Sequence, residues 1–344
     1  MIFLRFLLFP FAILYDLVTT IRNYFYDKGI FKSTSFNIPV ISVGNLSVGG
    51  TGKTPQIEYL IRLLQENKKV AVLSRGYKRK TKGFVLLNDS HTAEGVGDEP
   101  LQFFKKFSNT SNISIAVDAN RVNGIQQLQK LVNPDVILLD DAFQHRKVKA
   151  GFYVLLTKYN DLYTNDFILP TGNLRESRRG AKRANMVVVT KCPENLSEAE
   201  QQEITKKLKI KKGQDVFFSS ISYHSKTKGD HYIDVDKLNA YDEIVLITGI
   251  ANPAPLLQFL EEKECIINHL KFPDHHDFSD KDLEKIKSNI RSKSEKKLLL
   301  TTEKDYMRLS KHINKLCYLE IEPTFLGKNQ LFDKKITAYC NTGS

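Results

Sequence analysis

The chain has 344 residues, of which 41% are hydrophobic and 26% charged. These are globular values, so the composition does not indicate disorder, and the length predicts two domains of ordinary size. Lys and Arg exceed Asp and Glu by 51 − 39 = 12, which predicts an anionic partner such as phospholipid, nucleic acid or a phosphorylated substrate. The four cysteines lie far apart without a C-x-x-C pair, which argues against a zinc site or a disulfide scaffold.

The first 27 residues carry an apolar segment that is too short to span a bilayer. Its uninterrupted run, residues 6–15, lies between Arg5 and Asp16, whereas a spanning helix needs about twenty apolar residues. A signal peptide is not favoured, because no clear small-x-small cleavage site follows. We expect residues 1–27 to lie in a membrane interface, with a helix packed on the protein's own core as the alternative. The residues on its apolar helical face are Leu14, Leu17, Val18, Ile21, Tyr24 and Phe25.

Residues 40–55, VISVGNLSVGGTGKTP, indicate a phosphate-binding loop between a strand and a helix. The pattern G-x-x-x-x-G-K-[ST] is met except at its first position, where Ser47 replaces glycine. A β-rich run precedes the loop, and apolar residues follow it at helical spacing from Ile57 to Leu64. We interpret this as a nucleotide site in which Ser47 changes only the start of the loop and Gly44 adds slack upstream. A structural turn without a ligand is the alternative.

The residues of this loop suit the phosphates of ATP and a Mg²⁺ ion. Glycine N–H groups turn inward around an oxyanion, and the following helix points its positive end at the same place. The Lys53 ammonium would reach the β and γ phosphates, and the Thr54 hydroxyl would ligate Mg²⁺. The predicted nucleotide-binding residues are Gly49, Gly50, Thr51, Gly52, Lys53 and Thr54.

Strands and helices alternate after the loop, which predicts a parallel sheet covered by helices, with ligands at the carboxyl ends of its strands. Asp140 and Asp141 follow a buried-strand pattern and are placed to reach nucleotide-bound Mg²⁺, although a pair of strand-capping acids is the alternative. His145 follows a few residues later and could face the phosphates or be structural. The predicted strands are residues 70–73, 113–117, 136–139, 153–157 and 186–190, with a helix over 120–131.

Three further segments contain residues that could take part in chemistry. In GDEP, Asp98 is either a helix N-cap or a general base, and Glu99 reads as a first-turn acid that complements the helix dipole. LPTGNLRE supplies Arg175 for phosphoryl oxygens and Glu176 as a possible Mg²⁺ ligand, unless the two form a surface salt bridge. The third segment is FPDHH, which offers Asp274, His275 and His276 for metal binding or acid–base chemistry.

The second half of the chain predicts a linker and a smaller α/β domain. Two short alternating segments, FFSSISYHS and HYIDV, predict a two-stranded ribbon, and a second alternation of strands and helices follows it. The predicted divisions are a membrane-associated helix over 1–27, a P-loop domain over 28–215, a ribbon linker over 216–237 and a smaller α/β domain over 238–344.

Taken together and in order, these segments resemble the tetraacyldisaccharide 4'-kinase family of lipid A biosynthesis. The resemblance extends from the N-terminal helix to about residue 310. It implies transfer of the γ-phosphoryl group of ATP to the 4'-hydroxyl of a tetraacylated disaccharide 1-phosphate, at the cytoplasmic face of a Gram-negative inner membrane. The segments are VGNLSVGGTGKTP, LSRGYKRK, GDEP, LLDDAFQHR, LPTGNLRE, GIANP, FPDHHDF and LTTEKDYMRL.

The resemblance also implies roles for single residues. It pairs Asp98 with His275 to activate the hydroxyl, assigns Lys53 to the phosphates, and places His145 and Arg175 near them. Because Asp98 and His275 lie on different predicted domains, we expect the substrate in the cleft between the domains and closure of that cleft to complete the site. The implied Mg²⁺ ligands are Thr54, Asp140, Asp141 and Glu176.

Three positions depart from the family's usual residues. Ala142 stands where glycine is usual, Asn173 where proline is usual and Thr171 where alanine is usual. Ala142 should show strain if the loop needs a positive φ there. None of the three changes removes a charged group, so the expected activity stays the same.

Rival functions fit the sequence less well. A P-loop GTPase or metallochaperone-like nucleotide hydrolase would share the loop and the acids, but guanine recognition ordinarily uses N/T-K-x-D, and VVVTKCPE has Pro193 where that Asp belongs. A nucleic-acid motor is not favoured, because no aromatic and basic binding module is apparent. The sequence predicts no nucleic-acid partner and no obligate protein partner.

Overall fold

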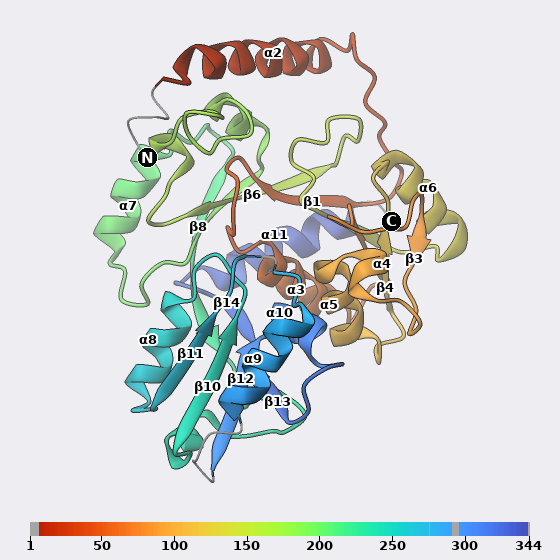
Figure 1. The fold of residues 1–344 in the computed structure, drawn as a ribbon. Coiled ribbons are helices and arrows are strands. Elements are labelled where there is room, and N and C mark those ends of the chain that lie inside the picture. The colour runs from red at the N-terminus through yellow and green to blue at the C-terminus, as the bar shows by residue number, and fades with distance from the viewer. Residues whose placement is uncertain (1–6, 275, 291–295, 343–344) are drawn as a thin grey trace.

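Two β-sheets organise the computed structural model, which describes residues 7–274, 276–290 and 296–342 (Figure 1). The larger sheet is parallel in its interior and has one antiparallel strand at each edge. In spatial order its strands are β14 (Ile321–Phe325), β8 (Asp215–Tyr223), β7 (Met186–Thr190), β6 (Phe152–Lys158), β1 (Val40–Asn45), β5 (Val136–Asp140), β2 (Val70–Ser74), β4 (Ile113–Val117) and β3 (Val85–Leu86).

The interior strands of this sheet are buried on both faces. All residues of β1, β2, β5 and β7 are buried, as expected for a parallel sheet whose two faces are covered by helices. The predicted α/β architecture with a parallel sheet is therefore confirmed. The helices of the larger unit are α3 (Lys53–Leu64), α4 (Ala93–Val96), α5 (Asp98–Phe107), α6 (Arg121–Leu131), α7 (Glu198–Lys207) and α11 (Asn329–Asn341).

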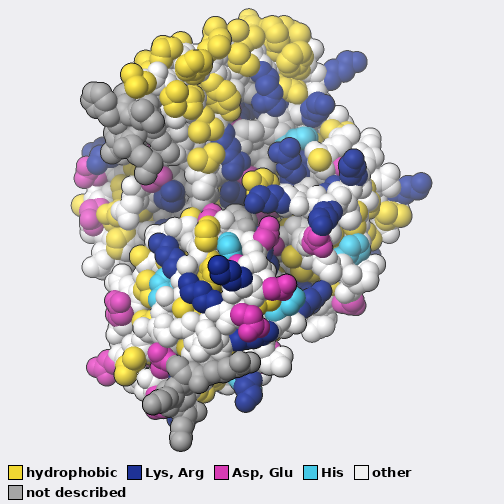
Figure 2. All heavy atoms as spheres, viewed as in Figure 1, with side chains coloured by type: hydrophobic (Ala, Val, Ile, Leu, Met, Phe, Trp, Pro, Cys, Tyr) yellow, Lys and Arg dark blue, Asp and Glu magenta, His cyan; other side chains and the backbone are white. Residues whose placement is uncertain are grey.

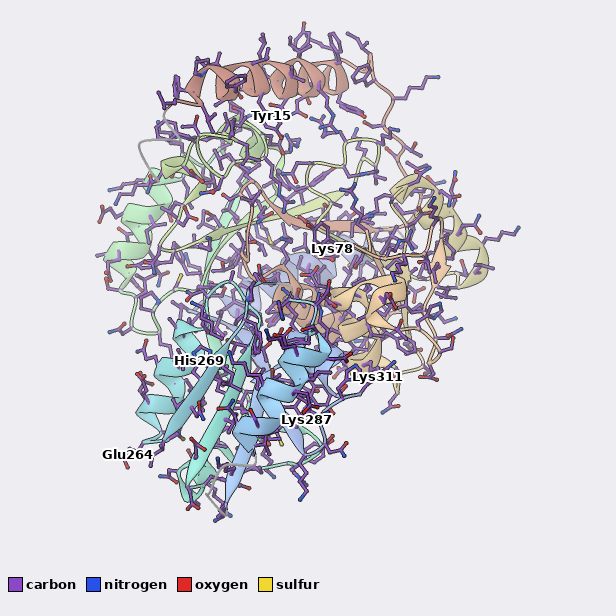
Figure 3. The ribbon with its side chains drawn as sticks, in the orientation of Figure 1. Tyr15, Lys78, Glu264, His269, Lys287 and Lys311 are labelled. Carbon is purple, nitrogen blue, oxygen red and sulfur yellow. The ribbon has the colours of Figure 1, made fainter. Side chains whose placement is uncertain are left out.

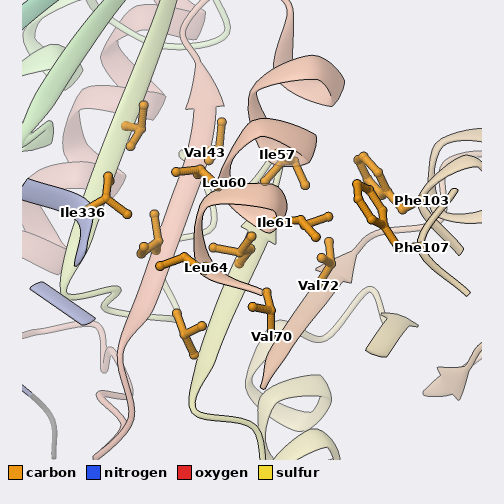
Figure 4. Close-up of a cluster of buried hydrophobic side chains, with 14 of the residues drawn as sticks. Val43, Ile57, Leu60, Ile61, Leu64, Val70, Val72, Phe103, Phe107 and Ile336 are labelled. Carbon is orange, nitrogen blue, oxygen red and sulfur yellow. The ribbon is translucent and has the colours of Figure 1, made fainter. Parts of the chain in front are cut away.

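Helix α3 lies at the centre of one hydrophobic core (Figure 4). Its apolar residues recur at helical spacing and pack against the strands, so the amphipathic pattern seen in the sequence fixes which face of α3 is buried. Phe103 and Phe107 of α5 belong to the same core. The helix that begins at the phosphate-binding loop is thus held rigidly on the sheet. The buried residues of α3 in this core are Ile57, Leu60, Ile61 and Leu64.

The smaller sheet is parallel except for one edge strand. In spatial order its strands are β11 (Ile267–Lys271), β10 (Glu243–Thr248), β12 (Lys297–Thr302), β13 (Leu316–Leu319) and β9 (Lys228–Gly229). Its helices are α8 (Ala254–Glu262), α9 (Asp280–Ile290) and α10 (Glu303–Leu309).

The prediction that two linker strands pair with each other is wrong. Strand β8 pairs in parallel with β7 and antiparallel with β14. The second predicted segment, residues 231–235, forms no strand and takes part only in an isolated antiparallel bridge between Lys226 and Asp234. The reason is that alternation of apolar and polar residues predicts a strand but does not identify its partner. The buried run Phe217–Ser220 instead belongs in the interior of the larger sheet.

The C-terminal segment returns from the smaller sheet to the larger one. Strand β14 forms the edge of the larger sheet, and Phe332 and Ile336 of α11 join the core around α3. The Tyr339 hydroxyl accepts a hydrogen bond from the Val40 amide at 3.1 Å. If the chain is divided according to its two sheets, the units differ from the predicted linker (216–237) and smaller domain (238–344), because residues 215–223 and 321–341 belong to the larger unit.

Helix α2 (Phe9–Asp27) lies across loops of the larger unit with its apolar face uncovered (Figures 1 and 2). Leu14, Leu17 and Val18 each expose more than half of their surface, at 58%, 54% and 57%. The predicted apolar face therefore does not pack on the protein's own core. In the described part of the chain, no helix combines the length and hydrophobicity that crossing a membrane requires.

Candidate active site

The phosphate-binding loop connects β1 to α3 at the carboxyl edge of the larger sheet. Ser47 is buried and forms an antiparallel bridge with Leu174, and the Val48 amide donates a hydrogen bond to the Asn173 carbonyl at 2.8 Å. The first position of the loop motif therefore accepts Ser47 in place of glycine, because the backbone here is strand-like. This pairing also brings the adjacent Arg175 beside the loop.

The inner face of the loop is open, and its outer side is anchored. A Cβ added at Gly49 or Gly50 would meet no other atom within 4 Å, and Gly49 has a positive φ of 100°. The Thr51 side chain accepts a hydrogen bond from Asn45 at 2.9 Å, and the Thr51 carbonyl accepts one from Thr190 at 2.9 Å. Among the described residues, no side chain caps the first N–H groups of α3. The loop is therefore a rigid cradle with free N–H groups, which suits an anion.

Asp141 lies between two cations at the end of β5. The Arg175 guanidinium donates to both Asp141 carboxylate oxygens at 2.9 and 3.0 Å, and the Lys53 ammonium lies 3.7 Å from one of them. Burial alone raises the pKa of Asp141, but Lys53 and Arg175 outweigh burial and hold it below its ordinary value. The structure thus brings Lys53, Asp141 and Arg175 together beside the loop, with the predicted Mg²⁺ ligand Asp141 paired to both cations.

Asp140 is placed to receive a cation. Its side chain is buried, and Ser74 donates a hydrogen bond to one carboxylate oxygen at 3.0 Å. The other oxygen, Oδ1, is buried without a hydrogen-bond partner in the described part of the chain. Burial, followed by the charges of Glu99 and Asp141, raises the pKa of Asp140 to about 7. An unpaired buried carboxylate oxygen fits a Mg²⁺ ion, which prefers such ligands.

Glu99 is a site residue that sequence analysis missed. Its carboxylate accepts a hydrogen bond from the Thr54 hydroxyl at 3.3 Å, and its charge acts on Asp140. The GDEP segment contained the signal, but a first-turn acid on a helix is also an ordinary stabilising feature. The described residues contain no group of three or more His, Cys, Asp or Glu side chains that could hold a metal. Any Mg²⁺ here would therefore need other ligands, such as Thr54, phosphate oxygens and water.

The predicted metal ligand Glu176 is held by protein donors instead. One of its oxygens accepts hydrogen bonds from Gln144 at 3.0 Å and Arg183 at 2.7 Å, and the other accepts one from Asn23 of α2 at 2.8 Å. These contacts favour a role for Glu176 in holding α2 on the loops of the site. The Tyr15 hydroxyl adds a hydrogen bond of 3.0 Å to the Arg175 carbonyl (Figure 3).

His145 lies in a cavity of about 450 Å³ beneath α2. Burial, followed by the nearby cations Arg121 and Lys147, lowers the pKa of His145 to about 4, so its imidazole is neutral at pH 7. Its Nε2 atom is buried without a hydrogen-bond partner among the described residues. Arg22 and Arg146 also line the cavity, which makes it a basic pocket beside the site.

Asp98 does not cap helix α5, contrary to one of the two sequence interpretations. The N-cap is Gly97, which has a φ of 97°, and Asp98 is the first helical residue. Arg308 of α10 donates to both Asp98 carboxylate oxygens, with a distance of 2.9 Å from its Nε atom, and it also donates to the His276 carbonyl. Arg308 is a second residue that sequence analysis missed, because its partner is 210 positions away.

The predicted partner of Asp98, His275, lies outside the described residues. Its neighbours in the FPDHH segment have structural partners: His276 lies 3.0 Å from an Asp282 carboxylate oxygen, and Asp274 accepts from Lys304 at 3.1 Å. The guanidinium of Arg308 nevertheless connects Asp98 directly to the backbone of His276. The structure therefore brings the FPDHH turn of the smaller unit to Asp98 of the larger one.

The backbone answers the question left open at Ala142 and corrects the expectation for Gly44. The positive φ in the loop after β5 is 46° at Asp141, one residue before Ala142, so the family glycine is not needed for a left-handed conformation at position 142. Gly44 does not provide slack: a Cβ there would lie 2.7 Å from the Phe143 Cβ. The small size of Gly44 is needed for the close approach of β1 and the loop after β5.

Comparison with known proteins gives a consistent match over nearly the whole chain. The family model described as tetraacyldisaccharide-1-P 4'-kinase matches residues 4–341. A tetraacyldisaccharide 4'-kinase of Flavobacterium johnsoniae is 57% identical, covering 98% of this chain and 97% of the relative. One of Bacteroides thetaiotaomicron is 46% identical, covering 89% and 83%.

A solved structure agrees with the sequence relatives. The crystal structure of LpxK from Aquifex aeolicus in complex with ATP has a TM-score of 0.78 and 31% identity, and the match covers 98% of this chain and 99% of that one. The rival interpretation as a GTPase or metallochaperone-like hydrolase is not favoured by these matches. With the phosphate cradle and its acids in place, the chain belongs to the tetraacyldisaccharide 4'-kinase family.

Proposed function

We propose that the chain transfers the γ-phosphoryl group of ATP to the 4'-hydroxyl of a tetraacylated disaccharide 1-phosphate. The observation that carries this proposal is the convergence of Lys53, Asp141 and Arg175 beside an open phosphate cradle, with Asp98 held at the same edge by the smaller unit. ATP binding is supported by the complex of the Aquifex relative. The acceptor follows from the activity named for the relatives.

The charges of the site suit phosphoryl transfer. In this reaction the acceptor oxygen forms a bond to the γ-phosphorus as the bond to the oxygen of the leaving ADP breaks, and catalysis consists mainly of positioning and charge stabilisation. Lys53 and the loop N–H groups would hold the phosphates, and Arg175 would balance charge beside them. Mg²⁺, when bound through Asp140 and Thr54, would neutralise charge on the phosphates. Glu99 is the further candidate for this metal position.

The acceptor hydroxyl needs a base, because a sugar hydroxyl is a weak acid. We assign this role to Asp98 acting with His275, where the carboxylate and imidazole together would accept the proton during transfer. This assignment is supported by Arg308, which holds both Asp98 and the backbone of His276, the residue next to His275. The substrate would then bind between the two units, and their closure would complete the site.

Helix α2 is proposed to place the enzyme on the cytoplasmic face of the inner membrane as a peripheral protein. Its exposed apolar face forms the hydrophobic surface at the top of Figure 2. The basic cavity lies directly beneath, so a lipid with acyl chains in the bilayer could present an anionic headgroup to Arg22, His145 and Arg146. The helix would therefore bring the lipid substrate and the ATP site together.

The proposed function is tested by label transfer from γ-labelled ATP to the lipid acceptor. Asp98→Asn should lower turnover by about 10²- to 10⁴-fold because the general base is lost, while ATP affinity stays within about twofold. Asp89→Asn, an exposed acid outside the site, is the matched control. Transfer at the wild-type rate by Asp98→Asn would refute the assignment of the base, and no labelled lipid with the wild-type enzyme would refute the activity.

Membrane attachment is tested with a double substitution that leaves the body intact. Leu14→Glu with Leu17→Glu places two charges on the exposed face of α2, so sedimentation with anionic lipid vesicles should fall at least tenfold while ATP affinity is unchanged. Glu66→Gln, on the exposed surface after α3, serves as the control. Equal sedimentation of the double variant and the wild type would contradict the role of α2.

A further inference from the structure

A buried ion cluster lies where the two units meet, outside the residues assigned to the reaction. Lys106 of α5 places its ammonium 2.6 Å from Glu58 of α3, 2.9 Å from Glu303 of α10 and 3.1 Å from Glu320 between β13 and β14. The exposed fractions of these side chains are 6% for Lys106, 1% for Glu58, 7% for Glu303 and 1% for Glu320. Gln102 of α5 also donates to Glu58, at 2.9 Å.

The elements in this cluster are those that carry the proposed site. Helix α3 begins at Lys53 and carries Glu58, and helix α5 begins at Asp98 and carries Lys106. Helix α10 contacts α5 at both of its ends, because Lys106 donates a hydrogen bond to Glu303 near one end of α5 and Arg308 forms an ion pair with Asp98 at the other. The smaller unit therefore reaches Asp98 through a helix whose first residue is fixed in the cluster.

We propose that Lys106 is a positioning residue for the phosphoryl transfer: with Glu58, Glu303 and Glu320 it forms a buried pivot that holds α10 against α5 and so keeps Arg308 on Asp98. This inference rests on the proposed role of Asp98. The three carboxylates around Lys106 are costly to bury, even with Arg62 3.8 Å from Glu58 and Lys228 2.8 Å from Glu320, and well-packed apolar residues often serve a core equally well. Its position between the two units is consistent with a geometric role.

The charge balance of the pivot makes it sensitive to pH. Burial, followed by the charge of Glu58, raises the pKa of Glu303 to about 8, so Glu303 is protonated at neutral pH and ionises above it. Its Oε1 atom is buried without a hydrogen-bond partner in the described part of the chain. Ionisation would add a negative charge beside Lys106 and the other two carboxyl groups. The charged and titratable groups that face the pivot are Arg62 from α3, Lys228 and His224 beside Glu320, and Tyr318 from β13.

The first test separates positioning from folding and from nucleotide binding. Lys106→Met should lower kcat for transfer at least tenfold while the Kd for ATP changes less than about twofold, because the apolar residues of α3 still hold the phosphate cradle on the sheet. Lys105→Met, the exposed neighbour on the same helix, is the matched control and should behave as the wild type. An unchanged kcat in folded Lys106→Met, or equal losses in kcat and ATP affinity, would overturn the proposal.

The second test does not require the loss of a buried cation. Glu303→Gln has the shape of the protonated side chain but does not ionise. At pH 9 only the wild type therefore gains the extra charge in the pivot and loses activity. The ratio of kcat at pH 9 to kcat at pH 7 should thus be at least threefold higher in the variant than in the wild type. Identical ratios would overturn the pivot. Asp98→Asn, assayed in parallel, distinguishes a wrong base assignment from a wrong pivot proposal. If this variant transfers phosphate normally, the proposed base is wrong. If it is inactive and both pivot variants are normal, only the pivot proposal is wrong.

Discussion

The two sides of the candidate site are built in different ways. The phosphate cradle comes from one continuous segment, in which β1, the loop and α3 follow each other within 25 residues and are anchored in one core. The opposite side joins Asp98 to Arg308 across 210 positions and two sheets. The first side is fixed by local structure, whereas the second depends on how the two units meet. Mutations should therefore affect nucleotide binding and transfer in separable ways.

Removing the lysine of the cradle should lower turnover more than changing the cation on the opposite side, Arg308. Lys53→Met deletes the ammonium that lies beside Asp141 and would contact the phosphates, so we expect turnover to fall by about 10²- to 10³-fold, as for the loss of a group that stabilises transition-state charge. Label transfer measures it, with exposed Lys69→Met as the control. If Lys53→Met lowered turnover less than Arg308→Lys does, the interdomain side would matter more for transfer than the cradle side, contrary to this prediction.

Acidification should weaken metal binding on the cradle side. The pKa of Asp140 is raised to about 7. Below pH 7 a proton on its carboxylate therefore competes with Mg²⁺, whereas above pH 7 the carboxylate is ionised and free to bind the metal. Mg²⁺ affinity, measured by calorimetry in the presence of nucleotide, should be about tenfold lower at pH 6 than at pH 7.5, since one pH unit changes proton occupancy up to tenfold. Asp140→Asn should bind weakly at both pH values. Equal affinities for the wild type would exclude Asp140 as a ligand.

On the side where the two units meet, kcat should depend on the shape of the Arg308 side chain as well as on its charge. Arg308→Lys keeps the positive charge but loses the fork that donates to both oxygens of Asp98. We expect kcat to fall about fivefold, which corresponds to losing one hydrogen bond of about 1 kcal/mol, with ATP affinity unchanged. Lys311→Met, an exposed substitution just after α10, is the control. A change in ATP affinity alone would contradict the separation of the two sides.

The smallest effect is expected where the chain departs from its family. Ala142 is buried and lies outside the positive-φ region, so Ala142→Gly gains no relief of strain and increases the freedom of the unfolded chain. We expect a loss of about 0.5 to 1 kcal/mol in the free energy of unfolding. Chemical denaturation measures it, with exposed Ala251→Gly as the comparison. A gain in stability would show that the loop prefers glycine at this position.

The sequence by itself determined the elements that depend on local pattern. The β1–loop–α3 unit, the buried strand before Asp140 and the apolar face of α2 could all be predicted, because their signals are hydrophobic periodicity and turn residues within short windows. Arg175 was predicted to lie near the phosphates and Asp141 to ligate Mg²⁺, and the structure pairs these two side chains with each other beside the loop.

Only the tertiary structure decided which distant segments meet. It decided that β8 pairs with β14 and not with a second ribbon strand. It also decided that α11 packs in the core of the larger sheet and that Arg308 binds Asp98. It also gave neighbouring residues different surroundings: one buried oxygen of Asp140 has no hydrogen-bond partner among the described residues, while Asp141 is neutralised by two cations. The physical reason is that strand partners, ion pairs and pKa shifts depend on the surroundings of a side chain, and these surroundings come from residues distant in the sequence, from 34 positions for Asp141 and Arg175 to 210 for Asp98 and Arg308.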